Sequence, residues 1–152
     1  MIQLTRRQIR AVRTTIRQSL GITNARKAPT VTFHSTPAEL LIQAATDKVA
    51  IEYRLPSNHQ PECFTVPYEA LTASEGKQDD SVFFNHSGDR VVLEWLDGGI
   101  PQSAAFPAGD PVEMPRSPDT LTPIEPGFLS AMANAVATTD QESTRYALNC
   151  VR

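Results

Sequence analysis

Cysteine is scarce in this sequence. Only Cys63 and Cys150 occur among the 152 residues, and neither stands in a CxxC or CxxH motif. Neither a disulfide framework nor a zinc site is indicated, because both need several cysteines or histidines at characteristic spacings. We predict that both cysteines are buried free thiols.

Long apolar runs are also missing. The sequence contains no stretch of about 18 consecutive apolar residues, and its first ten residues, MIQLTRRQIR, lack the apolar segment of a signal peptide. With 40% apolar and 20% charged residues, the composition is that of an ordinary globular protein. These features predict a soluble, cytoplasmic protein that consists of one domain with an appendage.

No catalytic or cofactor-binding motif is recognisable. His86, Ser87 and Asp89 are the residue types of a catalytic triad, but they fall within four positions around a predicted hairpin turn, where their side chains cannot line up. His34, His59 and His86 belong to different predicted elements and lack the spacing of metal ligands. No GxGxxG, P-loop or aromatic RNA-binding signature occurs. The sequence therefore predicts no enzyme, no metal site and no cofactor.

Acidic residues are absent from the first quarter of the chain. Residues 1–38 hold seven bases and no acid, a local charge of +7, whereas residues 39–152 hold seven bases and all seventeen acids. The seven N-terminal bases are Arg6, Arg7, Arg10, Arg13, Arg17, Arg26 and Lys27. A mildly acidic protein with one basic element has a directional field, which attracts a polyanion to one side only.

Most of these bases fall in a predicted helix that begins at Thr5 and ends near Gly21. Thr5 and Gln8 have the spacing of a capping box. An apolar stripe at helical spacing comprises Ile9, Val12, Ile16 and Leu20. A ridge beside that stripe comprises Arg6, Arg10, Arg13 and Arg17. With no acid at i±4, the ridge is either a solvated face or a phosphate-contacting surface, and we favour the second because solvated faces normally mix signs.

Three predicted strands follow this helix. Val31–His34, Leu40–Ala44 and Val49–Leu55 are rich in β-favouring residues, and only short polar turns separate them. This pattern is typical of an antiparallel meander. The third strand alternates apolar and polar residues, so one face of the sheet is apolar and needs the helix to cover it.

The same order of elements occurs a second time. The second set comprises a strand at Phe64–Val66, a helix at Tyr68–Ser74 and strands at Ser81–His86, Arg90–Leu96 and Ile100–Phe106. The β-α-β-β-β pattern therefore occupies residues 2–55 and again residues 62–106, which indicates an internal repeat within a domain of residues 1–115. Trp95, in the second repeat, is predicted to be a core or interface residue.

Residues 116–152 are predicted to be a linker and the incomplete start of a second similar domain. Six of the twelve prolines lie between Pro107 and Pro126, which favours an extended, irregular segment. Beyond it we predict a short strand at Leu121–Ile124, a helix at Gly127–Thr138 and a strand at Thr144–Val151. A third β-α-β pattern begins here, and two further strands would be expected after Arg152; whether Arg152 is the natural end stays open.

Several short segments resemble the bacterial DNA polymerase III beta subunit, the sliding clamp. They are Ala28-Pro29-Thr30-Val31, Ala45-Thr46-Asp47, Thr65-Val66-Pro67 and, most specifically, Thr144-Arg145-Tyr146-Ala147-Leu148-Asn149. The resemblance extends over the whole chain, with residues 1 to about 115 similar to the first domain of the clamp and residues 120–152 similar to the opening of its second.

The resemblance implies an α+β DNA clamp fold, in which internally duplicated β-α-β-β-β units place their helices on one face of antiparallel sheets. It also implies a processivity factor that encircles duplex DNA and catalyses nothing. The implied DNA-binding residues are Arg6, Arg10, Arg13, Arg17, Arg26 and Lys27. The implied partners are duplex DNA, with DNA polymerase and the clamp loader if the full-length protein is a true clamp, and a ring-forming homodimer only with the missing domains.

Two departures from the family pattern keep an alternative open. The turn Asp97–Pro101 carries no base where the family usually has a Gly-Arg-Ser-Arg-Phe-like turn, and Arg26 lies three rather than four residues before Pro29. The alternative is a diverged clamp-like module that binds proteins and does not encircle DNA.

Overall fold

The computed structural model describes residues 1–24, 27–116, 120 and 122–137. The chain divides into two compact units, Met1–Pro115 and Arg116–Arg152. In the described part of the chain, no helix is both long and apolar enough to cross a membrane.

The first unit contains the two predicted repeats. The first repeat comprises β1 (Ile2–Thr5), α1 (Arg6–Ser19), β2 (Val31–Ser35), β3 (Glu39–Ala45) and β4 (Ala50–Pro56). The second comprises β5 (Glu62–Val66), α2 (Tyr68–Ser74), β6 (Ser81–Ser87), β7 (Arg90–Asp97) and β8 (Ile100–Pro107). The predicted order is confirmed, and the predicted bounds are confirmed to within two residues; the largest differences are the start of β5 and the end of α1, each two residues earlier than predicted.

The two repeats exchange their first strands. One sheet has the strand order β1-β6-β7-β8 and the other has the order β4-β3-β2-β5, so each repeat contributes three strands to one sheet and one strand to the other. All the pairs are antiparallel, as the predicted meanders require. Neither repeat can complete its sheet alone, so the two repeats form one cooperative unit.

Three phenylalanine rings join the two sheets. Phe33 in β2 and its register partner Phe64 in β5 lie with ring centroids 5.3 Å apart, and Phe84 in β6 of the other sheet lies 5.0 Å from Phe33 and 6.2 Å from Phe64. All three residues are buried. Aromatic rings at these separations stabilise the fold beyond the effect of burial alone, and here they link β2 and β5 of one sheet to β6 of the other.

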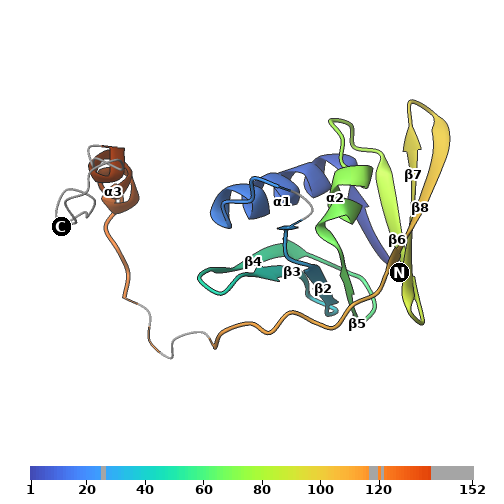
Figure 1. The fold of residues 1–152 in the computed structure, drawn as a ribbon, viewed down its shortest axis with the longest axis horizontal. Helices are drawn as coiled ribbons and strands as arrows, with labels where there is room; N and C mark the ends of the chain where they lie inside the picture. The colour runs from blue at the N-terminus through green and yellow to red at the C-terminus, as the bar shows by residue number, and fades with distance from the viewer. Residues whose placement is uncertain (25–26, 117–119, 121, 138–152) are drawn as a thin grey trace. The chain divides into compact units, whose positions relative to one another are not determined.

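The two helices of the unit lie side by side, as the repeat predicts. Figure 1 shows α1 and α2 next to each other on the same side of the sheet β4-β3-β2-β5. The hydroxyl of Tyr68 in α2 donates a hydrogen bond to the carbonyl oxygen of Arg13 in α1 at 3.2 Å. The fold predicted from the sequence, with paired helices against antiparallel sheets, is confirmed.

The segment after β8 continues along the first unit instead of leaving it at once. Gly109 forms a bridge with Thr65, and the amide of Val112 donates to the hydroxyl of Thr32 at 2.8 Å. The hydroxyls of Thr32 and Thr65 bond each other at 2.7 Å, and both threonines are buried. The two buried hydroxyl groups therefore have hydrogen-bond partners, one of which the segment after β8 supplies.

The second unit contains one described helix, α3 (Phe128–Ala137). It agrees with the helix predicted at 127–138, apart from Thr138, which is outside the described residues. Residues 122–124 are not in a strand, so the prediction of a strand at 121–124 is wrong for them, and Leu121 is outside the described residues. Pro123 lies inside this segment and Pro126 follows it, and the missing backbone N–H of each proline gives the physical reason. The strand predicted at 144–151 also lies outside the described residues.

The prediction that Cys63 is buried is wrong. Cys63 is exposed in β5, because strand alternation places it on the opposite face from the buried Phe64. Partial desolvation by its neighbours raises the pKa of the thiol, which disfavours the reactive thiolate form. Cys150 is outside the described residues.

Candidate nucleic-acid interface

Helix α1 has one buried side and one polar side. The buried side is the predicted stripe, with Ile9, Val12 and Ile16 inaccessible to solvent. The helix begins with the predicted capping box: the Gln8 amide donates to the Thr5 hydroxyl at 3.1 Å, and the Thr5 amide donates to the Gln8 side chain at 2.8 Å. These contacts fix the rotation of α1 and therefore the direction in which each arginine points.

Arg6 is a structural residue, which corrects its place in the predicted ridge. Its side chain is only 8% exposed. One terminal nitrogen donates to the Asp97 carboxylate at 2.7 Å and to the Leu96 carbonyl at 3.2 Å, and the other donates to the Glu75 carbonyl at 3.0 Å. Arg6 therefore connects the start of α1 to the end of α2 and to the turn between β7 and β8. A guanidinium held in this way has little capacity left for a phosphate.

Arg13 is also paired. Its Nε and one terminal nitrogen donate to the two oxygens of Glu75 at 2.6 and 2.7 Å, a bidentate pair in which both side chains are 21% exposed. The hydrogen bond with Glu75 is the main cause that holds the pKa of Arg13 above its ordinary value. Bidentate pairs of this geometry are among the stronger charge-assisted contacts, so Arg13 is largely neutralised.

Three of the predicted cations remain available to contact a phosphate: Arg10, Arg17 and Lys27. All three are exposed, and within the described residues none of them forms an ion pair. Arg10 and Arg17 are seven residues apart on α1, which is about two helical turns and puts both on the same side. Arg26 lies outside the described residues.

Arg7 adds a further cation that the predicted ridge did not include. It contacts Asp79 at 3.1 Å, with both side chains more than 60% exposed. Such exposed pairs are weak and are easily exchanged for another anion. The surface cations of α1 are therefore Arg7, Arg10 and Arg17 rather than the predicted set of four.

A hollow of about 470 Å³ lies at the C-terminal end of α1. Arg13 and Arg17 line it together with the polar side chains of Thr14, Gln18 and Thr23. Hydroxyl, amide and guanidinium donors in one hollow suit an oxyanion such as a backbone phosphate.

The acids that pair with Arg6 and Arg13 lie far away in the sequence. Glu75 is 62 residues from Arg13, and Asp97 is 91 residues from Arg6. A search of the sequence for acids four residues before or after each arginine could not find these two partners. The internal repeat was the one available signal, since equivalent helices in a duplicated fold lie side by side and an acid at the end of α2 then faces a base on α1.

The described residues include no group of three or more His, Cys, Asp or Glu side chains placed to hold a metal ion. Around the hairpin turn between β6 and β7, the His86 ring lies 3.1 Å from the Gly88 carbonyl oxygen. All three residues of the predicted triad pattern are described by the structure, and no hydrogen bond joins the side chains of His86, Ser87 and Asp89, so the structure gives no support to a catalytic triad there.

The unit Met1–Pro115 has two four-stranded antiparallel sheets and two paired helices from an internal repeat, which is the architecture of the clamp fold. No protein-family model matches the sequence, and a search of curated proteins gives no match. Solved structures do match, and bacterial beta clamps are among them.

The polymerase III beta subunit of Pseudomonas aeruginosa matches with a TM-score of 0.68 and 15% identity, over 97% of this chain and 42% of that one. The Helicobacter pylori beta clamp, solved with a DNA ligase peptide, matches with a TM-score of 0.65 and 15% identity, over 95% of this chain and 41% of that one. The chain thus has the clamp fold and spans about two fifths of the length of these proteins, and the resemblance inferred from the sequence is confirmed at the level of the fold.

Proposed function

We propose that the unit Met1–Pro115 is a domain of a DNA sliding clamp, a polymerase processivity factor without catalytic activity. The observation that carries this proposal is the pair of exposed guanidiniums of Arg10 and Arg17 on one side of α1 in a clamp fold, neither of which forms an ion pair with any described residue. Lys27 and Arg26 are the proposed accessory contacts.

Contacts of this kind suit a protein that must hold DNA and yet slide along it. Arginines that reach only phosphates position the duplex but read no bases, so the binding energy is nearly the same at every position. We propose duplex DNA as the ligand, with DNA polymerase and a clamp loader as protein partners in the cytoplasm. Ring closure requires further domains, so this chain by itself is expected to bind DNA weakly.

The test is a fluorescence-anisotropy titration of labelled duplex DNA over a range of salt concentrations. The logarithm of the affinity should fall against the logarithm of the salt concentration, with a slope on the order of −0.9 per phosphate neutralised. The double variant Arg10→Gln, Arg17→Gln should make that slope shallower by about two. Its thermal stability should stay nearly unchanged, because exposed like charges contribute little to folding.

Arg54→Gln is the charge control. Arg54 is an exposed arginine in β4 that pairs with Glu52, and its replacement removes one positive charge, half of what the double variant removes, from a different element. The slope of the control should equal that of the wild type. Equal slopes for the double variant and the wild type would contradict the proposed interface.

A second candidate function is the clamp-like protein-interaction module that does not encircle DNA. The observation that favours it is the neutralisation of Arg6 and Arg13, which leaves α1 with half of the predicted free guanidiniums. Absence of any DNA binding at low salt, with the fold intact, would support this candidate over the clamp.

A further inference from the structure

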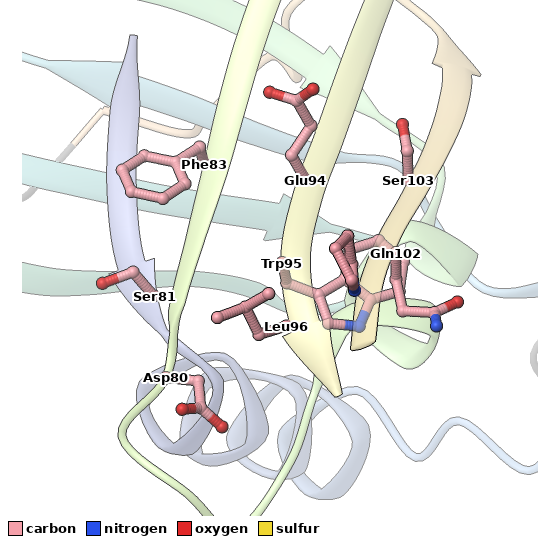
Figure 2. Close-up of a pocket in the computed structure, with 9 residues that line it drawn as sticks. Asp80, Ser81, Phe83, Glu94, Trp95, Leu96, Gln102 and Ser103 are labelled. Atoms are coloured by element: carbon pink, nitrogen blue, oxygen red, sulfur yellow. The ribbon is translucent and has the colours of Figure 1, made fainter. Parts of the chain in front are cut away.

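A second hollow lies on the sheet β1-β6-β7-β8, and it shares no lining residue with the hollow at the C-terminal end of α1. It has a volume of about 500 Å³ and is lined by residues of β6, β7 and β8 together with Asp80. This volume is within the range of ordinary ligand sites. Figure 2 shows the lining side chains along three neighbouring strands, so the hollow is an open trough across the sheet rather than an enclosed cavity.

The walls of the trough come from the outward side of the sheet. Phe83 and Glu94 are register partners, and so are Leu96 and Pro101. These residues alternate with the buried Val82 and Leu93, so they project away from the core. Leu96 is 46% exposed, so beside Phe83 and Pro101 it leaves an apolar surface open to solvent.

Trp95 contributes in a different way. Its register partner is the buried Val82, and its side chain packs against the core, as predicted for a core or interface residue. Trp95 is also one of the residues that line the trough. As the single tryptophan of the chain, it is a local fluorescent reporter directly beneath the trough.

The charges that line the trough are all of one sign. Asp80 and Glu94 are its two charged residues, and no base lines it. Figure 2 shows these two carboxylates at opposite ends of the labelled group. Glu94 accepts one hydrogen bond from Asn85, and within the described residues neither carboxylate forms an ion pair. An apolar floor between two acids disfavours a polyanion and suits an apolar group flanked by cations.

We propose that this trough binds an extended peptide segment of a partner protein in which large apolar residues lie next to lysine or arginine. The apolar side chains would cover Phe83 and Leu96, and the flanking bases would pair with Asp80 and Glu94. Neighbouring strands are about 4.8 Å apart, so three strands offer a width of roughly 10 Å, which accommodates one or two side chains of an extended chain. This site is independent of the proposed DNA interface, since the two share no residue.

The test uses the complete chain and a labelled hexapeptide with a Leu-Phe centre and a lysine on each side. Binding should give a dissociation constant of roughly 10 to 100 µM, as for weak transient contacts, and should change the fluorescence of Trp95. Leu96→Ser and Glu94→Lys should each weaken binding by about tenfold, because each removes a central contact. Excess duplex DNA should not displace the peptide.

Asp47→Lys is the matched control, since it reverses an exposed acid in the turn between β3 and β4 and should leave the affinity unchanged. A peptide with Ser-Gly in place of Leu-Phe should bind at least tenfold more weakly. Equal binding of both peptides, or an equal loss in the Glu94 and Asp47 variants, would overturn the proposal. So would a wild-type dimer in light scattering that Leu96→Ser dissociates, because the occupant would then be a second copy of the chain.

Discussion

Replacing Phe33 with alanine is expected to lower the free energy of unfolding by about 4 kcal/mol. Phe33 is fully buried, and its ring contacts Phe64 within its own sheet and Phe84 of the other sheet. The variant therefore loses burial, two aromatic contacts and the packing between the sheets. Since small domains are stable by about 5–15 kcal/mol, the loss is a large fraction of the total.

Urea denaturation followed by circular dichroism measures this effect. Phe106→Ala is the matched control, because Phe106 in β8 is only half-buried at the edge of the core and its truncation should cost about 1–2 kcal/mol. If the two variants lost equal stability, the three-ring cluster would not be the contact that joins the sheets.

Replacing Arg6 with alanine is expected to cost about 3 kcal/mol, the second largest effect. The change removes three charge-assisted hydrogen bonds that connect α1 to α2 and to the turn after β7. Arg10→Ala removes the same charge from an exposed position of the same helix, so it should change stability by less than about 0.5 kcal/mol.

Gly76 provides an independent check on the role of Arg6. A Cβ atom at position 76 would lie 2.7 Å from Nε and 2.9 Å from Cζ of Arg6, which three hydrogen bonds hold in place. Gly76→Ala should therefore cost about 1–3 kcal/mol in the wild type, and most of that cost should vanish when Arg6 is alanine. A double-mutant cycle measures the coupling. Strictly additive losses would show that Arg6 moves aside freely.

These structural roles change how a DNA-binding experiment on α1 must be designed. Substituting Arg6 or Arg13 perturbs folding contacts, because Glu75 takes part in both sets of hydrogen bonds. If such a variant lost DNA binding, the loss could come either from the missing DNA contact or from the perturbed fold. Arg10 and Arg17 avoid this problem, since no described residue pairs with either.

The elements of the fold were predictable because their signals are local. The capping box at Thr5 and Gln8 set the start of α1, and an apolar period of about 3.6 residues set its buried side. The turn at Gly98 and Gly99 was predictable for the same reason. Both glycines have positive φ angles, 59° and 83°, a conformation that glycine adopts without strain.

What the sequence by itself determined was thus the order of helices and strands, the duplication and the concentration of bases in α1. Only the tertiary structure decided which strands share a sheet and which arginines stay free. The exchange of β1 and β5 between the sheets, the pairing of Arg6 with Asp97 and the trough at Leu96 all depend on residues far apart in the chain. The periodicity of apolar residues predicts which side of a helix or strand is buried. It carries no information about which distant segment packs on that side or supplies the opposite charge.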